Sequence, residues 1–356
     1  MYVRLKVLTM IILNYELTET PKIKALLSQI KKQEKQLNAL SITHELFQEI
    51  FKHNYLRQAY SSTKIEYSLI DYNSAQKVLY SKKAKNEEER EILNVANAHM
   101  AISKYLKKRL SDDLIIDVHS QISEGLKGSL TEPDYRAGRY RNIKNYLGDP
   151  FTDQISYTFP EPKEVPKLMK KLNYFTNNND ALDKIIIPGI FHFVFIAIHP
   201  FINGNGRTVR VIEDMLLKKA GYNLQKLYNL SEYYYANVKR YHFALNRGRD
   251  QKDLTEFVEF YLKGITESQQ KVFDSKVLIE RLMKLHALPQ WKIMNKFDKK
   301  ILNYLAKNNE LTMKKALKLT SKKLTSEAVR LRFQKYIELG IMKKEGDYKT
   351  AKYIWA

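Results

Sequence analysis

The chain has 356 residues, of which 44% are apolar, so it can bury a substantial core in two or three domains. Its formal net charge of +22 favours acidic or phosphorylated partners, although an AT-rich genome would produce the same excess of lysine without any such function. The absence of cysteine excludes disulfide bonds and thiolate metal sites, and it fits a cytoplasmic location.

The N-terminus carries a short apolar run, Val7–Leu13, behind two cations. A signal peptide would look similar, but Thr9 interrupts the run and no small-residue cleavage site follows. We expect the start of a strand or helix here, or a start codon assigned upstream of Met10. No segment approaches the length needed to span a bilayer, so no membrane partner is expected. Residues 22–60 predict helix throughout, with apolar side chains at helical spacing.

The segment from Ser61 to Tyr67 places Ser62 and Glu66 one helical turn apart, on one face. From these residues alone, Glu66 is an ordinary exposed glutamate, or Ser61 or Ser62 caps the next helix. Residues 85–126 predict one or two further helices.

Residues 132–150 change character, because turn residues and β-forming residues replace the helical pattern. The segment predicts a short hairpin. Taken by itself, it is a surface hairpin with no ligand.

A buried helix opened by Pro188 is predicted to lead into His199, and a second helix to follow a tight loop. Two glycines of the loop, within three residues, indicate close approach of the backbone to another group. Free N–H groups at the start of the second helix suit a phosphate, and Arg207 and Arg210 lie on one of its faces. His199 is a candidate general base across the loop.

Each of these features has a structural alternative: a histidine after a buried helix, a turn, and two arginines on a solvated face. The occurrence of all three features together at fixed spacing favours a functional site over these structural alternatives. His192 shares a face with His199, but we interpret it as a buried structural histidine, because the spacing of this pair is not typical of zinc ligands.

The rest of the chain predicts the end of this domain and a separate tail. The aromatic residues of 230–245 are interpreted mainly as core, and a helix over Leu254–Ile265 closes the domain. Residues 266–292 form a linker helix, and 293–356 contain three helices and two terminal strands. Ser326 is expected to cap the third helix and Gly340 to end it. That helix is expected to expose side chains that suit a major groove, namely Glu327, Arg330, Arg332, Gln334 and Lys335.

The stretch from His199 to Arg210 resembles the signature of the Fic family, His-Pro-Phe-x-(Asp/Glu)-Gly-Asn-Gly-Arg-x-x-Arg. Every specified position matches except Asn203, where the family usually has an acid. The resemblance implies a mainly α fold with a Fic-like core and a short β-hairpin flap over 90–265. The N-terminal helical extension covers 1–89 and precedes this core, and the linker helix follows it. The three helices and terminal hairpin of 293–356 separately resemble a winged helix, a module that binds DNA or contacts proteins.

Fic proteins mostly transfer AMP from ATP to a Ser, Thr or Tyr hydroxyl of a target protein, and this chain is expected to do the same, to itself as well. The resemblance implies His199 as the base, Gly204, Asn205 and Gly206 as a cradle for the phosphates, and Arg207 and Arg210 on the β- and γ-phosphates. It also assigns Leu147, Gly148 and Tyr241 to the nucleotide, and Tyr140, Asn145 and Tyr146 of the flap to the target.

Many Fic proteins carry an inhibitory (Ser/Thr)-x-x-x-Glu-(Gly/Asn) motif before the core. Ser62 and Glu66 match it, and Tyr67 departs from its last position. The resemblance therefore implies that Glu66 pairs with Arg210 and displaces the γ-phosphate.

The departure at Asn203 concerns magnesium, because the family's acid holds that ion. An amide oxygen lacks the charge that magnesium favours, so we expect ATP itself to recruit the metal. Three alternatives stay open: the reverse hydrolysis of AMP-modified protein, a regulator that binds DNA through 293–356, and a donor other than ATP for UMP, phosphate or phosphocholine. A homo-oligomer is a further expectation.

Overall fold

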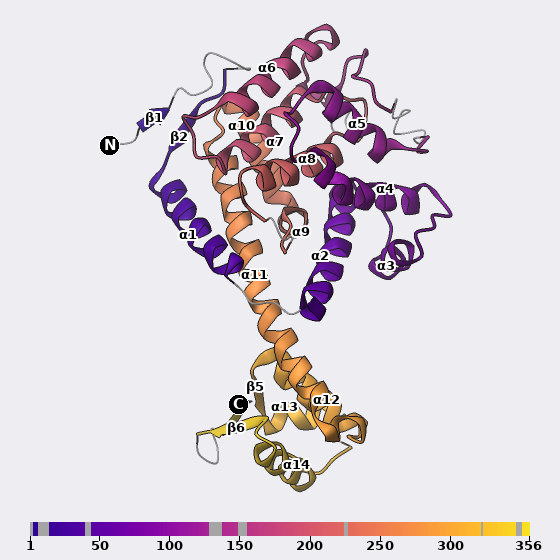
Figure 1. Ribbon diagram of the computed structural model, residues 1–356, viewed down its shortest axis with the longest axis vertical. Coiled ribbons are helices and arrows are strands. Elements are labelled where there is room, and N and C mark those ends of the chain that lie inside the picture. Colours follow the sequence, from indigo (N-terminus) through magenta and orange to yellow (C-terminus); the bar gives the residue numbers. More distant parts are fainter. Residues whose placement is uncertain are drawn as a thin grey trace. The chain divides into compact units, whose positions relative to one another are not determined.

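The protein is mainly helical, as predicted, and divides into two compact units, Met1–Val272 and Phe273–Ala356 (Figure 1). This division falls inside the segment that was predicted to be a linker helix. The computed structural model describes residues 3–5, 14–39, 44–127, 137–148, 155–223, 227–321, 323–346 and 351–356.

The first unit consists of helices with two small antiparallel ribbons, β1–β2 and β3–β4. Its strands are β1 Val3–Leu5, β2 Leu17–Glu19, β3 Tyr146–Gly148 and β4 Ile155–Thr158. Its α-helices before the hairpin are α1 Pro21–Asn38, α2 His44–Ile65, α3 Tyr72–Ser81, α4 Glu87–Ala101 and α5 Asp112–Ser123. Those after it are α6 Val165–Asn178, α7 Ile186–Ile198, α8 Asn205–Lys219, α9 Leu230–Ala236, α10 Val238–Gln251 and the start of α11 Thr255–Ala287.

Helix α7 lies at the centre of this unit, and its side chains are almost all buried. Its continuous apolar sequence leaves no solvated face, so neighbours must cover it on every side. Gly189 allows the ring of Tyr261 on α11 to come close, since a Cβ there would lie 2.6 Å from a ring carbon. The Tyr261 hydroxyl then donates to the carbonyl of Ile185 at 2.9 Å. The sequence predicted that Pro188 would open this helix. The helix begins at Ile186, so Pro188 lies within its first turn.

Helices α1 and α2 replace the single helical run predicted over 22–60, with residues 40–43 outside the described part of the chain. Helix α1 packs along α11, where the Gln269 amide donates to Glu34 at 2.7 Å. Helix α2 continues through Ser62, which is therefore not a helix cap. Helix α3, which was not predicted, follows and is capped by Asp71.

Helix α11 is longer than predicted, because it runs past Ile265 to Ala287. No proline or glycine interrupts the sequence between Gly264 and the end of the helix, so nothing stops it. Gly264 itself lies within the helix, where the ring of Tyr233 occupies the space that a Cβ would take.

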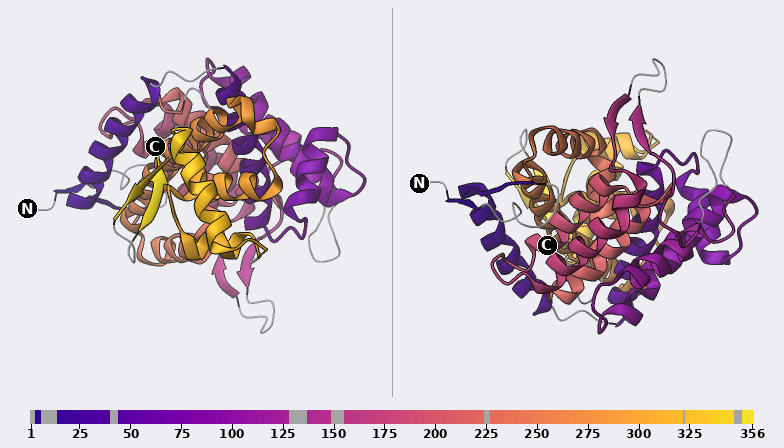
Figure 2. Two further views of the ribbon diagram at one scale, coloured as in Figure 1. Left: turned by 90° about the horizontal axis from the view of Figure 1, so that it is seen from below. Right: turned by 90° about the horizontal axis from the view of Figure 1, so that it is seen from above.

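The predicted hairpin is present as β3 and β4, which project from the helical body (Figure 2). Its first part and its tip, residues 128–136 and 149–154, lie outside the described residues. The base is fixed by Arg141, whose backbone N–H donates to Pro200 at 2.8 Å and whose Nε donates to the His199 carbonyl at 2.7 Å.

The second unit has its own core. It contains α12 Lys296–Asn308, β5 Glu310–Thr312, α13 Met313–Leu319, α14 Ser326–Glu338, β6 Met342–Glu345 and β7 Lys352–Trp355. The strands form an antiparallel sheet in the order β5-β7-β6. The apolar side chains that pack between helices and sheet include Ile301, Leu305, Val329, Phe333 and Tyr353.

Two predictions about α14 are wrong in detail. The N-cap is Thr325, whose hydroxyl accepts from the Ala328 N–H at 3.2 Å, and not Ser326. Arg332 is half-buried and pairs with Asp298 on α12 at 3.1 Å, so it is not part of the exposed face. Gly340 follows the helix with a φ of +66°, in the left-handed conformation expected after a helix end.

Among the helices in the described ranges, none is both long and apolar enough to cross a bilayer.

Candidate active site

The predicted helix–loop–helix is present: α7 ends at Ile198, and α8 begins at Asn205. Two residues with positive φ turn the chain between them, His199 at +53° and Gly204 at +77°. His199 donates its backbone N–H to Phe195 and so ends α7. The turn brings the start of α8, with its free N–H groups, next to the imidazole.

The loop is held rigid by side chains on both sides of it. The amide of Asn205 accepts from the Phe201 N–H and donates to the Phe201 carbonyl, both at 2.9 Å. His119 on α5 accepts from the Gly138 N–H at Nδ1, so its Nε2 carries the proton and donates to the Asn203 carbonyl at 3.0 Å. Its ring stacks on Phe201 at 3.7 Å. His119 therefore joins α5, the loop and the base of the hairpin.

His199 is placed to act as a base. Its ring is half-buried and stacks on Phe159, with the centroids 4.2 Å apart. Burial and then the nearby cation of Arg141 lower the pKa of His199 to about 4. The imidazole is therefore neutral at physiological pH, and its Nδ1 has no hydrogen-bond partner among the described residues.

Arg210 is enclosed by the end of α2, as its 2% exposure shows. Its Nε donates to the Ser62 hydroxyl at 2.9 Å, and one terminal nitrogen donates to the Ser62 carbonyl and to Glu66, both at 2.8 Å. Burial opposes ionisation of Glu66, but the charges of Arg210 and Arg207 outweigh it and hold the pKa of this carboxyl below its usual range. The ion pair is therefore present at neutral pH.

The Glu66 carboxylate lies directly on the start of α8. A Cβ at Gly206 would lie 2.1 Å from the carboxylate oxygen of Glu66, so only a glycine leaves room for it. A helix N-terminus favours an anion through its free N–H groups and its dipole. Glu66 thus occupies the position that an anionic ligand of this loop would take.

Arg207 is also 2% exposed, and it meets a different acid. One terminal nitrogen pairs with Glu91 on α4, and the other donates to the side-chain oxygen of Asn203 at 2.9 Å. Burial lowers the pKa of Arg207 to about 10, which leaves the guanidinium charged at neutral pH.

The side chain of Asn203 does not fit a protein-held metal ion. Its oxygen accepts from Arg207 and from the Gly204 N–H at 2.6 Å, so its lone pairs face donors and a cation. No group of three or more His, Asp or Glu side chains that could hold a metal was found within the described part of the chain.

Below Arg210, α8 continues into a buried polar layer. His192 is fully buried, as predicted: its Nδ1 donates to Glu213 at 2.9 Å, and its Nε2 accepts from the Tyr241 hydroxyl at 2.8 Å. Burial raises the pKa of Tyr241, and the nearby charge of Arg210 offsets this in part. Tyr241 thus lies beneath Arg210 with its hydroxyl engaged inside the protein.

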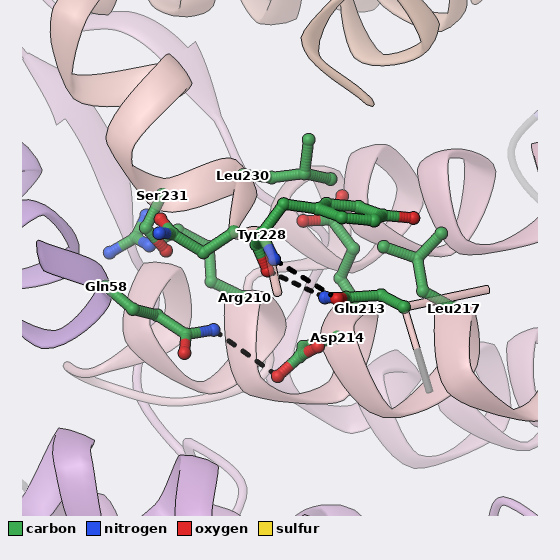
Figure 3. Close-up of a pocket in the computed structure, with 10 residues that line it drawn as sticks. Gln58, Arg210, Glu213, Asp214, Leu217, Tyr228, Leu230 and Ser231 are labelled. Carbon is green, nitrogen blue, oxygen red and sulfur yellow. Dashed lines mark hydrogen bonds between the residues drawn. The ribbon is translucent and has the colours of Figure 1, made fainter. Parts of the chain in front are cut away.

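Helix α2 is fixed to α8 at a second point, beside the same layer. Figure 3 shows Gln58 of α2 reaching Asp214, which lies one turn beyond Arg210, and the two side chains are joined at 3.3 Å. Lys218 pairs with the Asp214 carboxylate and supplies a buried positive charge that balances it. The segment that carries Glu66 is therefore anchored independently of its contact with Arg210.

The hairpin residues divide between two roles. Tyr146, Leu147 and Gly148 are exposed on β3. Asn145 donates to the carbonyls of Phe201 and Ile202 at 3.4 Å, so it ties the strand to the loop. Tyr140, which was predicted to contact the target, packs against Phe201, and its hydroxyl donates to Asp112 at 3.0 Å.

Three residues of the site were not predicted from the sequence. They are Glu91, His119 and Arg141, which holds the base of the hairpin. Glu91 is one of several acidic residues at the start of α4, and His119 is a single polar residue on an apolar helical stripe, so nothing in the local sequence marks either of them. Arg141 lies in the segment 132–150, which was predicted only as a hairpin.

Comparison with family models matches residues 109–217 to the Fic/DOC family. Over these residues the chain is similar to the Fic/DOC family. They include α5, the base of the hairpin, α7, the loop and most of α8, so the matched part contains His199, Arg207 and Arg210.

Among curated relatives, the chain is similar to the protein adenylyltransferase Fic of Drosophila grimshawi, with 27% identity over 196 residues. This alignment covers 52% of the chain and 38% of the relative. The protein adenylyltransferase Fic of Nematostella vectensis is 26% identical over 177 residues, which are 48% of the chain and 39% of the relative. The chain thus spans well under half the length of these relatives.

Two solved structures show the same fold. A Fic family protein from Desulfovibrio desulfuricans superposes with a TM-score of 0.61 at 20% identity, over 95% of this chain and 97% of that one. Fic-1 from C. elegans gives a TM-score of 0.56 at 19% identity, over 74% of each chain.

Proposed function

We propose that this protein transfers AMP from ATP to a hydroxyl group of a protein, and that Glu66 restrains the reaction in the resting state. The observation that carries the proposal is the position of the Glu66 carboxylate. It lies on the start of α8 and on Arg210, beside a neutral histidine. An anion site, a base and a displaceable carboxylate in one place suit a polyphosphate substrate.

In the proposed reaction, His199 takes the proton of the target hydroxyl, whose oxygen attacks the α-phosphorus of ATP. The bond from that phosphorus to the bridging oxygen of the β-phosphate breaks, and pyrophosphate leaves. The backbone N–H groups of Asn205 and Gly206 stabilise the charge on the phosphates, while the Gly204 N–H is already donated to Asn203. Arg207 and Arg210 contact the β- and γ-phosphates. The side chain of Asn205 closes the loop, so its contribution is from the backbone.

Magnesium is expected to arrive with ATP, because the oxygen of Asn203 is engaged by Arg207 and Gly204. The magnesium–ATP complex is then the substrate, and the protein contacts its phosphates.

The exposed strand β3 is the proposed site for the target segment. It pairs with β4 on one side, and its residues Tyr146 to Gly148 are exposed. An extended segment can add to such a strand through backbone hydrogen bonds. The conformation of that segment, more than its sequence, would then bring its hydroxyl to His199.

The test is transfer of label from α-labelled ATP to protein, itself included, by the wild type, Glu66→Gly and the double variant Glu66→Gly, His199→Ala. Glu66→Gly should raise transfer because it frees Arg210 for the γ-phosphate. Adding His199→Ala should lower that activity by about 10²–10⁴-fold, the usual effect of losing a general base. Equal activity in all three proteins would contradict the proposal.

The opposite reaction, hydrolysis of AMP-modified protein, uses the same residues with Glu66 orienting water. It is distinguished by incubating an AMP-modified protein with each variant. Release of AMP that is lost in Glu66→Gly would assign the protein to hydrolysis.

A further inference from the structure

Arg207 has a carboxylate partner of its own, Glu91, on a helix different from the one that leads to Glu66. Glu91 lies in the second turn of α4, and its side chain is 12% exposed. It pairs with one terminal nitrogen of Arg207, while Asn203 accepts from the other. Both ends of this guanidinium are therefore engaged within the protein.

The partners of the two arginines differ in a way that matters for a phosphate ligand. Arg210 is held by Ser62 at the end of α2 and by Glu66 just after it, and Arg207 is held by Glu91 from α4. A phosphate that approaches Arg207 meets a guanidinium whose charge Glu91 already balances, and it competes with that carboxylate for N–H donors that lie in one fixed plane. A change at Glu66 does not remove this second carboxylate.

We propose that Glu91 is a second restraining carboxylate, which neutralises Arg207 and competes with the β-phosphate of a nucleotide, as Glu66 competes with the γ-phosphate. The proposal rests on the assignment of this loop to a nucleotide. Glu91 acts through its ion pair with Arg207, so it is a positioning residue and not a catalytic one.

The proposal predicts that loss of each carboxylate changes nucleotide affinity according to the number of phosphates in the nucleotide. AMP has no β-phosphate, so its binding should not depend on whether Arg207 is free. ADP and ATP should bind more tightly when Glu91 loses its charge. Glu66→Gly should act mainly on ATP, whose γ-phosphate needs Arg210.

The experiment measures the dissociation constants of AMP, ADP and ATP for the full chain by calorimetry, in the wild type, Glu91→Gln, Glu66→Gly and the double variant. Glu91→Gln should tighten ADP binding by about tenfold, which corresponds to about 1.4 kcal/mol, and leave AMP unchanged. The double variant should bind ATP more tightly than either single variant. Glu267→Gln is the matched control, because this carboxylate is exposed and pairs with Lys263 on α11.

Removing a partner from a buried cation also destabilises a fold, so thermal unfolding of each variant is measured with and without ADP. If Glu91→Gln does not fold, Glu91→Asp tests the same point, since it keeps the charge but is too short for the same contact. An unchanged or weaker ADP affinity would overturn the proposal, as would equal gains for AMP and ADP or no ADP binding in any variant. If ADP binds as expected but no variant transfers AMP, the proposed function fails and the role of Glu91 stands.

Discussion

At the scale of single residues, the site depends on a few side chains that are held in fixed orientations. His199 has a left-handed backbone conformation, and its carbonyl accepts a hydrogen bond from Arg141. The residue with the candidate catalytic imidazole therefore also holds the hairpin in place. The sequence motif identified His199, Arg207 and Arg210, because their spacing along the loop is local. It did not identify Glu91 or His119, because their contacts join helices that are far apart in the sequence and leave no local pattern.

The depressed pKa of His199 predicts the dependence of the reaction on pH. The imidazole is the active form as a base, and its pKa of about 4 means that it stays neutral well below the usual titration range of histidine. For Glu66→Gly, kcat/KM should therefore be nearly constant from about pH 8 down to about pH 5.5. Initial rates at subsaturating ATP, at constant ionic strength, check this.

The contrary result is an acid limb near pH 6.5, the value of an unperturbed histidine. A histidine kept neutral by burial also disfavours the folded state in acid, because the unfolded chain binds the proton more readily. Circular dichroism at each pH therefore has to show that the variant is folded wherever rates are compared.

At the scale of elements, the sequence predicted the types of most helices better than their ends. The buried helix α7 follows from its continuous apolar run, and the amphipathic helices of the second unit follow from their periodicity. The helix that closes the domain was predicted to end at Ile265, with a separate linker helix after it, whereas α11 is one helix that runs through Gly264 to Ala287. A tertiary contact decides this position, since the ring of Tyr233 lies against the glycine.

Replacing Gly264 with alanine distinguishes packing from helix propensity. Propensity alone predicts a gain of roughly 1 kcal/mol, since alanine favours a helix interior. A Cβ at this position would lie 2.6 Å from the ring of Tyr233, which is buried against Phe260. Overpacking of this kind typically costs ~1–3 kcal/mol, so we expect the free energy of unfolding in urea to fall.

The control is the same substitution in a Tyr233→Ala background, where the ring is absent. There the added methyl group should be neutral or stabilising. A gain of stability in the wild-type background would show instead that the ring moves aside freely.

At the scale of the whole molecule, the chain joins a unit that contains the match to the Fic/DOC family to a second unit with its own core. That unit has the helix and strand order α12-β5-α13-α14-β6-β7, and its sheet order is β5-β7-β6. We propose that it is a winged helix and that α14 binds DNA. The high positive charge of the whole chain would attract nucleic acid to any surface, so the proposal needs a test that separates α14 from the total charge.

The position of the cut matters for any truncation. A break near residue 290 would leave Leu278, Leu282 and Leu285 of α11 on the first fragment, although these side chains pack against the core of the second unit. Reversing charges in the full chain avoids exposing them. Arg330 and Lys335 are exposed on α14, whereas Arg332 is paired with Asp298 and is left unchanged.

The double variant Arg330→Glu, Lys335→Glu should weaken duplex DNA binding and leave AMP transfer by the Glu66→Gly protein unchanged. If both cations contact phosphates, the slope of log K against log salt should fall by about 2.

The control is Lys292→Glu, Lys300→Glu, which changes the net charge equally at two other exposed lysines of the same unit. Binding measured by fluorescence anisotropy at several salt concentrations compares the two proteins. Equal losses in both would mean that total charge attracts the DNA and that α14 has no special role. A loss confined to the α14 variant would assign the duplex to this helix, because only the placement of the charges differs between the two proteins.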